Sequence, residues 1–187
     1  MSLPLQLETI KTKPKDFDND IDRVNHIVGT VMNLIPSSAF VCIEDYYVPF
    51  SSAQIGAAVK LVSLGTIMRF ALYHHKIPFV VISPSQLKKF ATGKGNCQKN
   101  MVLREVFKRW GVDCVDDNQA DALTLAKMAH HISAGKWSSA VGLDMSYTGT
   151  GFCYIEGNLD TSIEVPKFQV DLLAKVRKEN RSYGCTL

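Results

Sequence analysis

A chain of 187 residues, of which 46% are hydrophobic and 21% are charged, suits a single globular domain with a sizeable core. We find neither the pattern of a signal peptide nor an apolar run approaching the roughly 20 residues that cross a bilayer, which argues against a membrane protein. Five scattered cysteines without a Cys-x-x-Cys pair argue against a zinc site and suit a reducing compartment such as the cytoplasm, and the net charge of +3 is too small to identify a partner.

The first half of the chain alternates between predicted strands and helices. Residues 5–13 alternate partly between apolar and polar side chains and predict a strand, and residues 16–34 have apolar positions at helical spacing with acids in the first turn. The run 39–43 is continuously apolar, as expected of a strand buried on both faces. A long helix rich in small residues is predicted over 52–75, followed by a second buried strand over 78–82.

The second half begins with a predicted loop over 91–96, followed by amphipathic helices over 98–110 and 116–131. Residues 142–155 predict two short strands joined by a tight Ser/Thr/Gly turn, and residues 168–181 predict a basic amphipathic helix. This alternation, with an antiparallel pair at one end, predicts a mixed, layered α/β domain.

Three carboxylates lie where an apolar element meets solvent. Asp144 interrupts a strand that otherwise favours burial, Glu44 closes the strand 39–43, and Asp121 lies in the first turn of a helix. A carboxylate in a buried strand is costly unless a cation or hydrogen bonds compensate it. Carboxylates at strand and helix ends can converge on two hard bivalent cations, an arrangement that suits in-line displacement at phosphorus. Alternatively, Asp121 is only a helix N-terminal acid and Glu44 only a polar strand end.

Lysine and arginine residues concentrate in two regions. Such clusters are either solvated faces or sites for a polyanion, and the neighbouring candidate metal ligands add weight to the second interpretation. The loop 92–96 exposes backbone N–H groups beside a lysine and suits a phosphate, although short Gly-Lys-Gly turns are common and the spacing of a P-loop is missing. The first cluster consists of Lys88, Lys89, Lys94, Lys99, Arg104, Lys108 and Arg109, and the second of Lys175, Arg177, Lys178 and Arg181.

Four segments together resemble the motifs of the RuvC-like Holliday junction resolvases of the RNase H-like superfamily. They are Gly-Leu-Asp-Met-Ser-Tyr-Thr-Gly-Thr-Gly at 142–151, Ile-Glu at 43–44, Ala-Asp-Ala-Leu at 120–123 and the stretch 83–99 with its Thr-Gly-Lys-Gly core. No single motif is specific, but the set covers nearly the whole chain apart from the basic tail.

The resemblance implies an RNase H-like α/β fold with a mixed five-stranded sheet flanked by helices. It implies one nuclease domain over 1–187, with the family's first strands in 137–165 and a basic helical tail in 167–187. It also implies a homodimer that cleaves four-way DNA junctions with Mg²⁺ or Mn²⁺, two ions per site, without a membrane or a nucleotide cofactor. A bacterial or phage-infected cell, or another reducing compartment that contains DNA, would be its setting.

By position, the resemblance makes Asp144, Glu44 and Asp121 metal ligands in the catalytic site. Tyr47 matches an aromatic residue that the family uses against bases near the junction, whereas we expect Tyr46 to pack into the core. The residues that match or neighbour the family's phosphate-contacting loop and helix are Lys88, Lys94, Lys99 and Arg104.

Two features depart from the family's pattern. Three residues before Asp121, where the family usually has a fourth acid or a histidine, this chain has Asn118. Either Asn118 completes the metal site through its carbonyl oxygen or the preceding Asp117 does, and either residue could instead cap the helix. The strand with Asp144 normally opens the chain but lies near its end here, so the order reads as a circular permutation that moving 137–165 to the front would reverse.

Other functions fit the residues less closely. A related RNase H-like nuclease could act on flaps, forks or RNA–DNA hybrids, which only substrate assays separate from junction cleavage. A junction-binding scaffold could have lost cleavage together with the fourth acid. An actin-like ATPase, with 144–151 as its phosphate-binding hairpin, would need a much longer chain.

Overall fold

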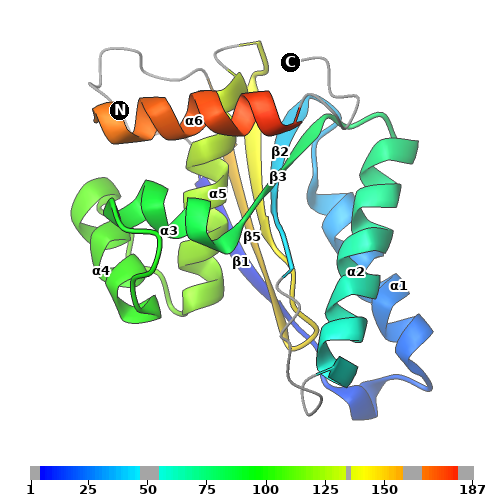
Figure 1. Cartoon of the computed structure of the whole chain (residues 1–187). Coiled ribbons are helices and arrows are strands. Elements are labelled where there is room, and N and C mark those ends of the chain that lie inside the picture. The colour runs from blue at the N-terminus through cyan, green and yellow to red at the C-terminus, as the bar shows by residue number, and fades with distance from the viewer. Residues whose placement is uncertain (1–4, 47–54, 134–135, 158–165, 181–187) are drawn as a thin grey trace.

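A mixed five-stranded sheet forms the centre of the computed structural model, which describes residues 5–46, 55–133, 136–157 and 166–180 (Figure 1). The strands follow the spatial order β1-β5-β4-β2-β3. Strands β2, β3 and β4 are parallel to one another, and β5 is antiparallel to both β4 and β1. The expected mixed five-stranded sheet is confirmed. Its strands are β1 (Leu5–Lys11), β2 (Ala39–Glu44), β3 (Phe79–Ile82), β4 (Ser139–Asp144) and β5 (Gly149–Glu156).

Helices cover both faces of this sheet and enclose two hydrophobic cores (Figure 1). On one face lie α1 (Asp20–Leu34) and α2 (Ile55–His74), after a short 3-10 helix η1 (Pro14–Asp16). On the other face lie α3 (Pro84–Thr92), α4 (Lys99–Trp110), α5 (Asp117–Ser133) and α6 (Lys167–Asn180). The flanking helices complete the expected α/β class of fold.

Helix α3 was not predicted from the sequence, and residues 91 and 92 of the expected loop form its last turn. Ser83 caps this helix by accepting a hydrogen bond from the Gln86 N–H, while the Gln86 side chain accepts one from the Ser83 N–H. The Ser-x-x-Gln pattern is the sequence signature of such a capping box. Pro84 fits the first helical position, where no backbone donor is needed.

Helix α2 has 20 residues, and the mean hydropathy over an 18-residue window of it is 1.6, so the expectation that no apolar stretch approaches the length of a membrane span is wrong. By length and composition it is the one helix in the described part of the chain that could cross a membrane. This is weak evidence, because a helix of a soluble protein can meet the same criterion. Its exposed large apolar side chains fall on one side of the helix, and we call them the α2 apolar stripe: Ile55, Val59, Ile67, Phe70 and Tyr73.

Helix α6 is tied to the rest of the fold by polar contacts with neighbouring backbone. The Asn180 amide accepts a hydrogen bond from the N–H of Val81 (2.9 Å) and donates one to its carbonyl (3.2 Å), which covers part of the edge strand β3. Arg177 donates to the carbonyl of His131 (2.7 Å) at the C-terminal end of α5. Arg177 therefore stabilises a helix end, and Arg181 lies outside the described residues, as does the expected connection over 162–165.

Arg23 of α1 holds the turn between β4 and β5 from the sheet face that α1 and α2 cover. It is 5% exposed and donates to the Thr12 hydroxyl (2.9 Å) and to the Tyr147 carbonyl (2.7 Å). Its guanidinium also lies 5.2 Å from the centre of the Tyr147 ring. These contacts determine where the turn that follows Asp144 lies.

Candidate active site

The carboxyl ends of β2 and β4 bring two of the predicted carboxylates next to each other. These strands are neighbours and parallel, with Ile43 opposite Leu143. The next position in this register places Glu44 beside Asp144. Because neighbouring strands lie about 4.8 Å apart, the two backbones approach closely at this edge of the sheet.

Both carboxylates also leave the sheet on the same side. Side chains alternate along a strand, and Phe40 and Cys42 of β2 belong to the core on the α5 face, as does Ala140 of β4. Glu44 and Asp144 continue these two alternations and point toward the helix α5. Asp144 is 9% exposed, and Glu44 is partly exposed.

Helix α5 can lie directly on β4 and β5 because the strands present glycines beneath it. A β-carbon at Gly142 would lie 2.0 Å from the Ala122 carbonyl oxygen, and one at Gly151 would lie 2.1 Å from the Asn118 carbonyl oxygen. No side chain fits in these spaces. The close approach places Asp121, which precedes Ala122, over the edge where Glu44 and Asp144 end.

A cavity of about 300 Å³ opens at this edge and is lined by all three predicted carboxylates. Asn118 and Lys88 line it too, whereas Asp117 is not among its lining residues. The structure therefore brings together residues from β2, β4, α3 and α5 that are far apart in the chain. The remaining lining residues are Asp45, Tyr46, Leu61, Gly65, Pro84, Val102, Met145 and Ser146.

The position at which α5 begins explains why Asn118 lines the cavity and Asp117 does not. Asp116 caps the helix, because its carboxylate accepts a hydrogen bond from the Gln119 N–H (2.9 Å). The Thr9 hydroxyl donates to the same carboxylate (3.1 Å). Neither Asn118 nor Asp117 is the N-cap, so that alternative is wrong for both. Asn118 faces the cavity from the first turn, and α5 begins before Asp121, which lies in its second turn.

The chemical types of the donor atoms in the cavity suit a hard bivalent cation. The lining of the cavity includes the carboxylates of Glu44, Asp45, Asp121 and Asp144 and the amide of Asn118, and such oxygen ligands are the ones that Mg²⁺ and Mn²⁺ prefer. Within the described parts of the chain, however, no three His, Cys, Asp or Glu side chains already stand close enough together to hold an ion. Metal binding in this cavity therefore stays a prediction.

Asp45 and Ser146 line the cavity but were not predicted from the sequence. Asp45 directly follows Glu44, and Ser146 lies two residues after Asp144. Tyr46 also lines the cavity, but its ring packs on α2: a β-carbon at Gly65 would lie 3.1 Å from the Tyr46 Cδ1 atom. The expectation that Tyr46 packs into the core is therefore not confirmed, because its ring is half-buried against α2 and borders the cavity. Tyr47 lies outside the described residues.

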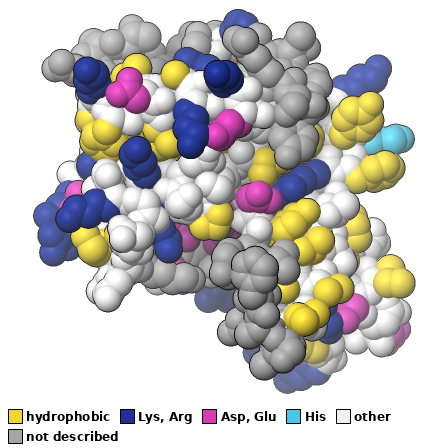
Figure 2. Space-filling model, in the orientation of Figure 1, with side chains coloured by type: hydrophobic (Ala, Val, Ile, Leu, Met, Phe, Trp, Pro, Cys, Tyr) yellow, Lys and Arg dark blue, Asp and Glu magenta, His cyan; other side chains and the backbone are white. Residues whose placement is uncertain are grey.

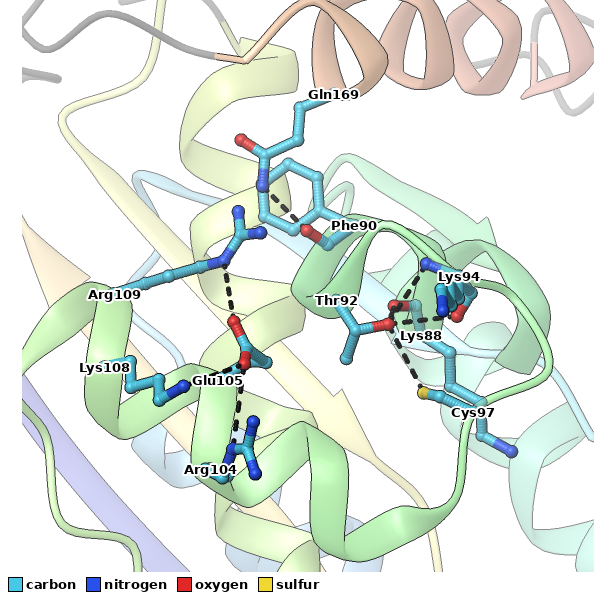
Figure 3. Close-up of polar contacts among 10 residues, drawn as sticks. All are labelled: Lys88, Phe90, Thr92, Lys94, Cys97, Arg104, Glu105, Lys108, Arg109 and Gln169. Carbon is cyan, nitrogen blue, oxygen red and sulfur yellow. Dashed lines mark hydrogen bonds and ion pairs between the residues drawn. The ribbon is translucent and has the colours of Figure 1, made fainter.

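Basic side chains gather over α3, α4 and α6, beside the cavity (Figure 2). Lys94 lies in the loop after α3, and the Thr92 hydroxyl shapes that loop by donating to the Lys88 carbonyl (2.8 Å) and accepting from the Lys94 N–H (3.1 Å) (Figure 3). Lys94 is exposed and does not line the cavity. The side chain of Lys99 is outside what the structure describes, although its backbone begins α4.

On α4, three cations surround one carboxylate. Arg104, Lys108 and Arg109 lie 4.0, 3.7 and 3.8 Å from Glu105 (Figure 3). The Arg104 side chain is 68% exposed, so this contact leaves it largely open to solvent. The local surplus of positive charge suits a polyanion on this surface.

The comparison with solved structures gives matches, whereas the comparisons with protein-family models and with curated proteins give none. No protein-family model matches the chain, and no curated protein is significantly similar. Among solved structures, the Thermus thermophilus RuvC structure is 23% identical, covers 67% of this chain and 74% of its own, and has a TM-score of 0.46. T. thermophilus RuvC in complex with Holliday junction substrate is 21% identical, covers 63% and 70%, and has a TM-score of 0.48. Likenesses this distant say nothing about what the site does, so its chemistry is inferred from its own residues.

Proposed function

We propose that this protein is a metal-dependent, structure-selective endonuclease that resolves four-way DNA junctions by hydrolysing phosphodiesters. One observation carries the proposal: Glu44 and Asp144 end neighbouring parallel strands at the same register, beneath the helix that presents Asp121. The four motifs that resemble the RuvC-like resolvases fall on this cavity or on the α3–α4 segment beside it.

In this proposal each lining residue has a distinct task. Glu44, Asp121 and Asp144 would hold Mg²⁺ or Mn²⁺, and Asn118 would add its amide oxygen to the set or orient one of the carboxylates. Ions held by these residues would supply the chemistry of metal-assisted phosphodiester hydrolysis, namely an activated water and stabilisation of the leaving oxygen. Lys88, at the rim, would bind a phosphate of the cut strand and orient it toward the carboxylates.

A substrate panel tests the proposal. Labelled four-way junction, flap, fork, linear duplex and RNA–DNA hybrid are incubated with the protein, with Mg²⁺ or with EDTA. We expect paired nicks in the four-way junction that require Mg²⁺, with far slower cutting of the duplex. Preferential cutting of flaps, forks or hybrids would instead assign the site to a related RNase H-like nuclease.

A second candidate, a junction-binding scaffold without cleavage, is favoured by one observation. Asn118 stands where a fourth acid would be expected. A scaffold would retain junction binding in EDTA and leave every member of the panel uncut with Mg²⁺ or Mn²⁺.

Self-association through α2 is the second part of the proposal. Two nicks on opposite strands require two sites, which a twofold homodimer supplies. The α2 apolar stripe runs along one side of the molecule and is a surface that a second copy would cover (Figure 2). It lies on the helix face opposite the buried residues Leu64, Met68 and Leu72.

Replacing Phe70 by Asp is expected to convert the dimer into a monomer, because it places a charge within the α2 apolar stripe, where Phe70 is 66% exposed. Light scattering over a range of protein concentrations measures the mass. Val170→Asp is the matched control, since Val170 is an exposed apolar residue on α6. A parent protein that is monomeric, or a Phe70→Asp variant that keeps the dimer mass, would rule out this interface.

Replacing Lys88 by Ala is expected to weaken junction binding and to lower the slope of log affinity against log salt by about 1, as loss of one phosphate contact does. Lys89→Ala is the control, because Lys89 is the adjacent lysine on α3 but does not line the cavity. Binding is measured in EDTA at several salt concentrations. Equal slopes for the two variants would place Lys88 away from the DNA.

The whole chain, in this proposal, is one RuvC-like domain whose elements are circularly permuted. The pairing of β1 with β5, which sets Leu5 opposite Ile155, supports it, because a loop could join these two strands as a hairpin. The family's order would then run from the strand of Asp144 to the helix of Asp121.

A further inference from the structure

The chain that follows Glu44 is held by two residues of α2. Arg69 donates to the Asp45 carboxylate, with 2.7 Å between Nη2 and Oδ1. The Arg69 side chain is 19% exposed and that of Asp45 is 40% exposed, so the pair is partly shielded from water. The Arg69 Nε is buried and has no hydrogen-bond partner among the described residues, and the contacts shown for the guanidinium are with Asp45 and with the ring beside it.

That ring belongs to Tyr46. The Arg69 guanidinium carbon lies 4.7 Å from the ring centre, a cation–π contact, and Gly65 accommodates the other edge of the ring. The Tyr46 N–H also donates to Asp45 Oδ1 (3.0 Å). Gly65 and Arg69 are one helical turn apart, so α2 holds Asp45 and Tyr46 as a unit.

The sheet holds the same segment from the other side. The Asp45 N–H donates to the carbonyl of Ile82, the last residue of β3, at 2.7 Å. Glu44 therefore lies between two fixed points, the β2–β3 ladder before it and the Arg69 contact after it. Asp45 is also a fourth carboxylate of the cavity, and the Arg69 charge offsets it.

From these contacts we infer that Arg69 is a positioning residue for the proposed active site, because through Asp45 it fixes where Glu44 points. The inference rests on the proposed function. Removing a group that hydrogen-bonds to metal ligands and orients them typically weakens metal affinity by about 10- to 100-fold.

The test compares metal binding and cleavage in the full-length protein. Arg69→Met keeps much of the aliphatic stem against Tyr46 while removing the charge and the donors. We expect the Mn²⁺ concentration that half-saturates the rise in melting temperature to increase about tenfold, with a matching shift in the Mn²⁺ dependence of junction nicking. Junction affinity in EDTA should stay within about twofold of the parent and the dimer mass should be unchanged, because Arg69 is neither a proposed DNA contact nor a member of the α2 apolar stripe.

Two further variants of Asp45 separate positioning from simple packing. Asp45→Asn keeps an oxygen that can accept from Arg69 and from the Tyr46 N–H, so its Mn²⁺ midpoint should stay near that of the parent. Asp45→Ala removes the acceptor and should behave like Arg69→Met. Lys60→Ala is the matched control, because Lys60 lies on α2 like Arg69, forms an exposed ion pair with Asp20 of α1 (2.6 Å) and does not line the cavity.

The outcomes distinguish a failure of the proposed function from a failure of the positioning role of Arg69. A parent protein that neither gains stability with Mn²⁺ nor nicks junctions would reject the proposed function itself. A parent that does both, together with an Arg69→Met variant whose Mn²⁺ midpoints equal those of Lys60→Ala, would overturn the positioning role alone. If Arg69→Met does not fold, the Asp45→Ala and Asp45→Asn pair gives the same comparison.

Discussion

Replacing Asp144 by Asn is expected to lower the rate of metal-dependent junction nicking by about a thousandfold or more. The substitution removes one ligand charge from the cavity while keeping the size of the side chain. Metal ions supply several kcal/mol of transition-state stabilisation in such sites, and a loss of about 4 kcal/mol corresponds to about a thousandfold in rate. The rate is measured with labelled four-way junction under single-turnover conditions.

The controls for Asp144→Asn separate chemistry from folding and binding. Junction affinity in EDTA should change little, because Asp144 contributes a metal ligand and no phosphate contact in this account. Asp171→Asn, a charge-matched change at an exposed position of α6, should leave nicking unchanged. Nicking by Asp144→Asn at the parent rate would remove Asp144 from the catalytic site.

Replacing Gly142 by Ala is expected to destabilise the protein by about 3 kcal/mol or more. The added β-carbon would lie 2.0 Å from the Ala122 carbonyl oxygen and 2.3 Å from the Ala126 nitrogen. Both contacts are with the backbone of α5, which cannot turn away as a side chain can, so the cost lies at the upper end of overpacking changes of about 1–3 kcal/mol or above it. Urea unfolding followed by circular dichroism measures the free energy of unfolding.

Gly29→Ala is the matched control for Gly142→Ala. Gly29 is in the helix α1, and a β-carbon there would meet nothing within 4 Å. Alanine in a helix is favoured over glycine by about 0.8–1.0 kcal/mol, so this variant should be as stable as the parent or more stable. If Gly142→Ala instead unfolded at the parent urea concentration, α5 could not lie on β4 as described, and the placement of Asp121 would be lost with it.

Much of the fold was predictable because its periodicities are strong. The continuous apolar runs that became β2 and β3 and the spacing that became α1 and α4 are confirmed within a few residues. Helix α3 was missed because its nine residues contain too few apolar positions to show a period, although the Ser83–Gln86 capping box was readable. Helix α2 was not identified from the sequence as a helix long and apolar enough to cross a membrane, because small and polar residues stand between its apolar residues.

The candidate site was only partly predictable. Its residues could be selected from the sequence, since a carboxylate such as Asp144 stands out in an apolar strand. Their arrangement could not, because the register of Glu44 against Asp144 depends on strand pairing between segments about a hundred residues apart. The choice between Asn118 and Asp117 for the cavity likewise depends on where α5 begins, which the Asp116 cap determines. Whether the carboxylates bind an ion stays a prediction.

The central claim is that Glu44, Asp121 and Asp144 bind bivalent cations in one cavity. Diffraction from crystals soaked in Mn²⁺, recorded for the anomalous signal of manganese, tests it most directly. We predict one or two anomalous peaks in the cavity, each with carboxylate oxygens at roughly 2.0–2.4 Å, and none in crystals of Asp144→Asn. Fully soaked crystals of the parent protein without a peak among these three side chains would contradict the claim.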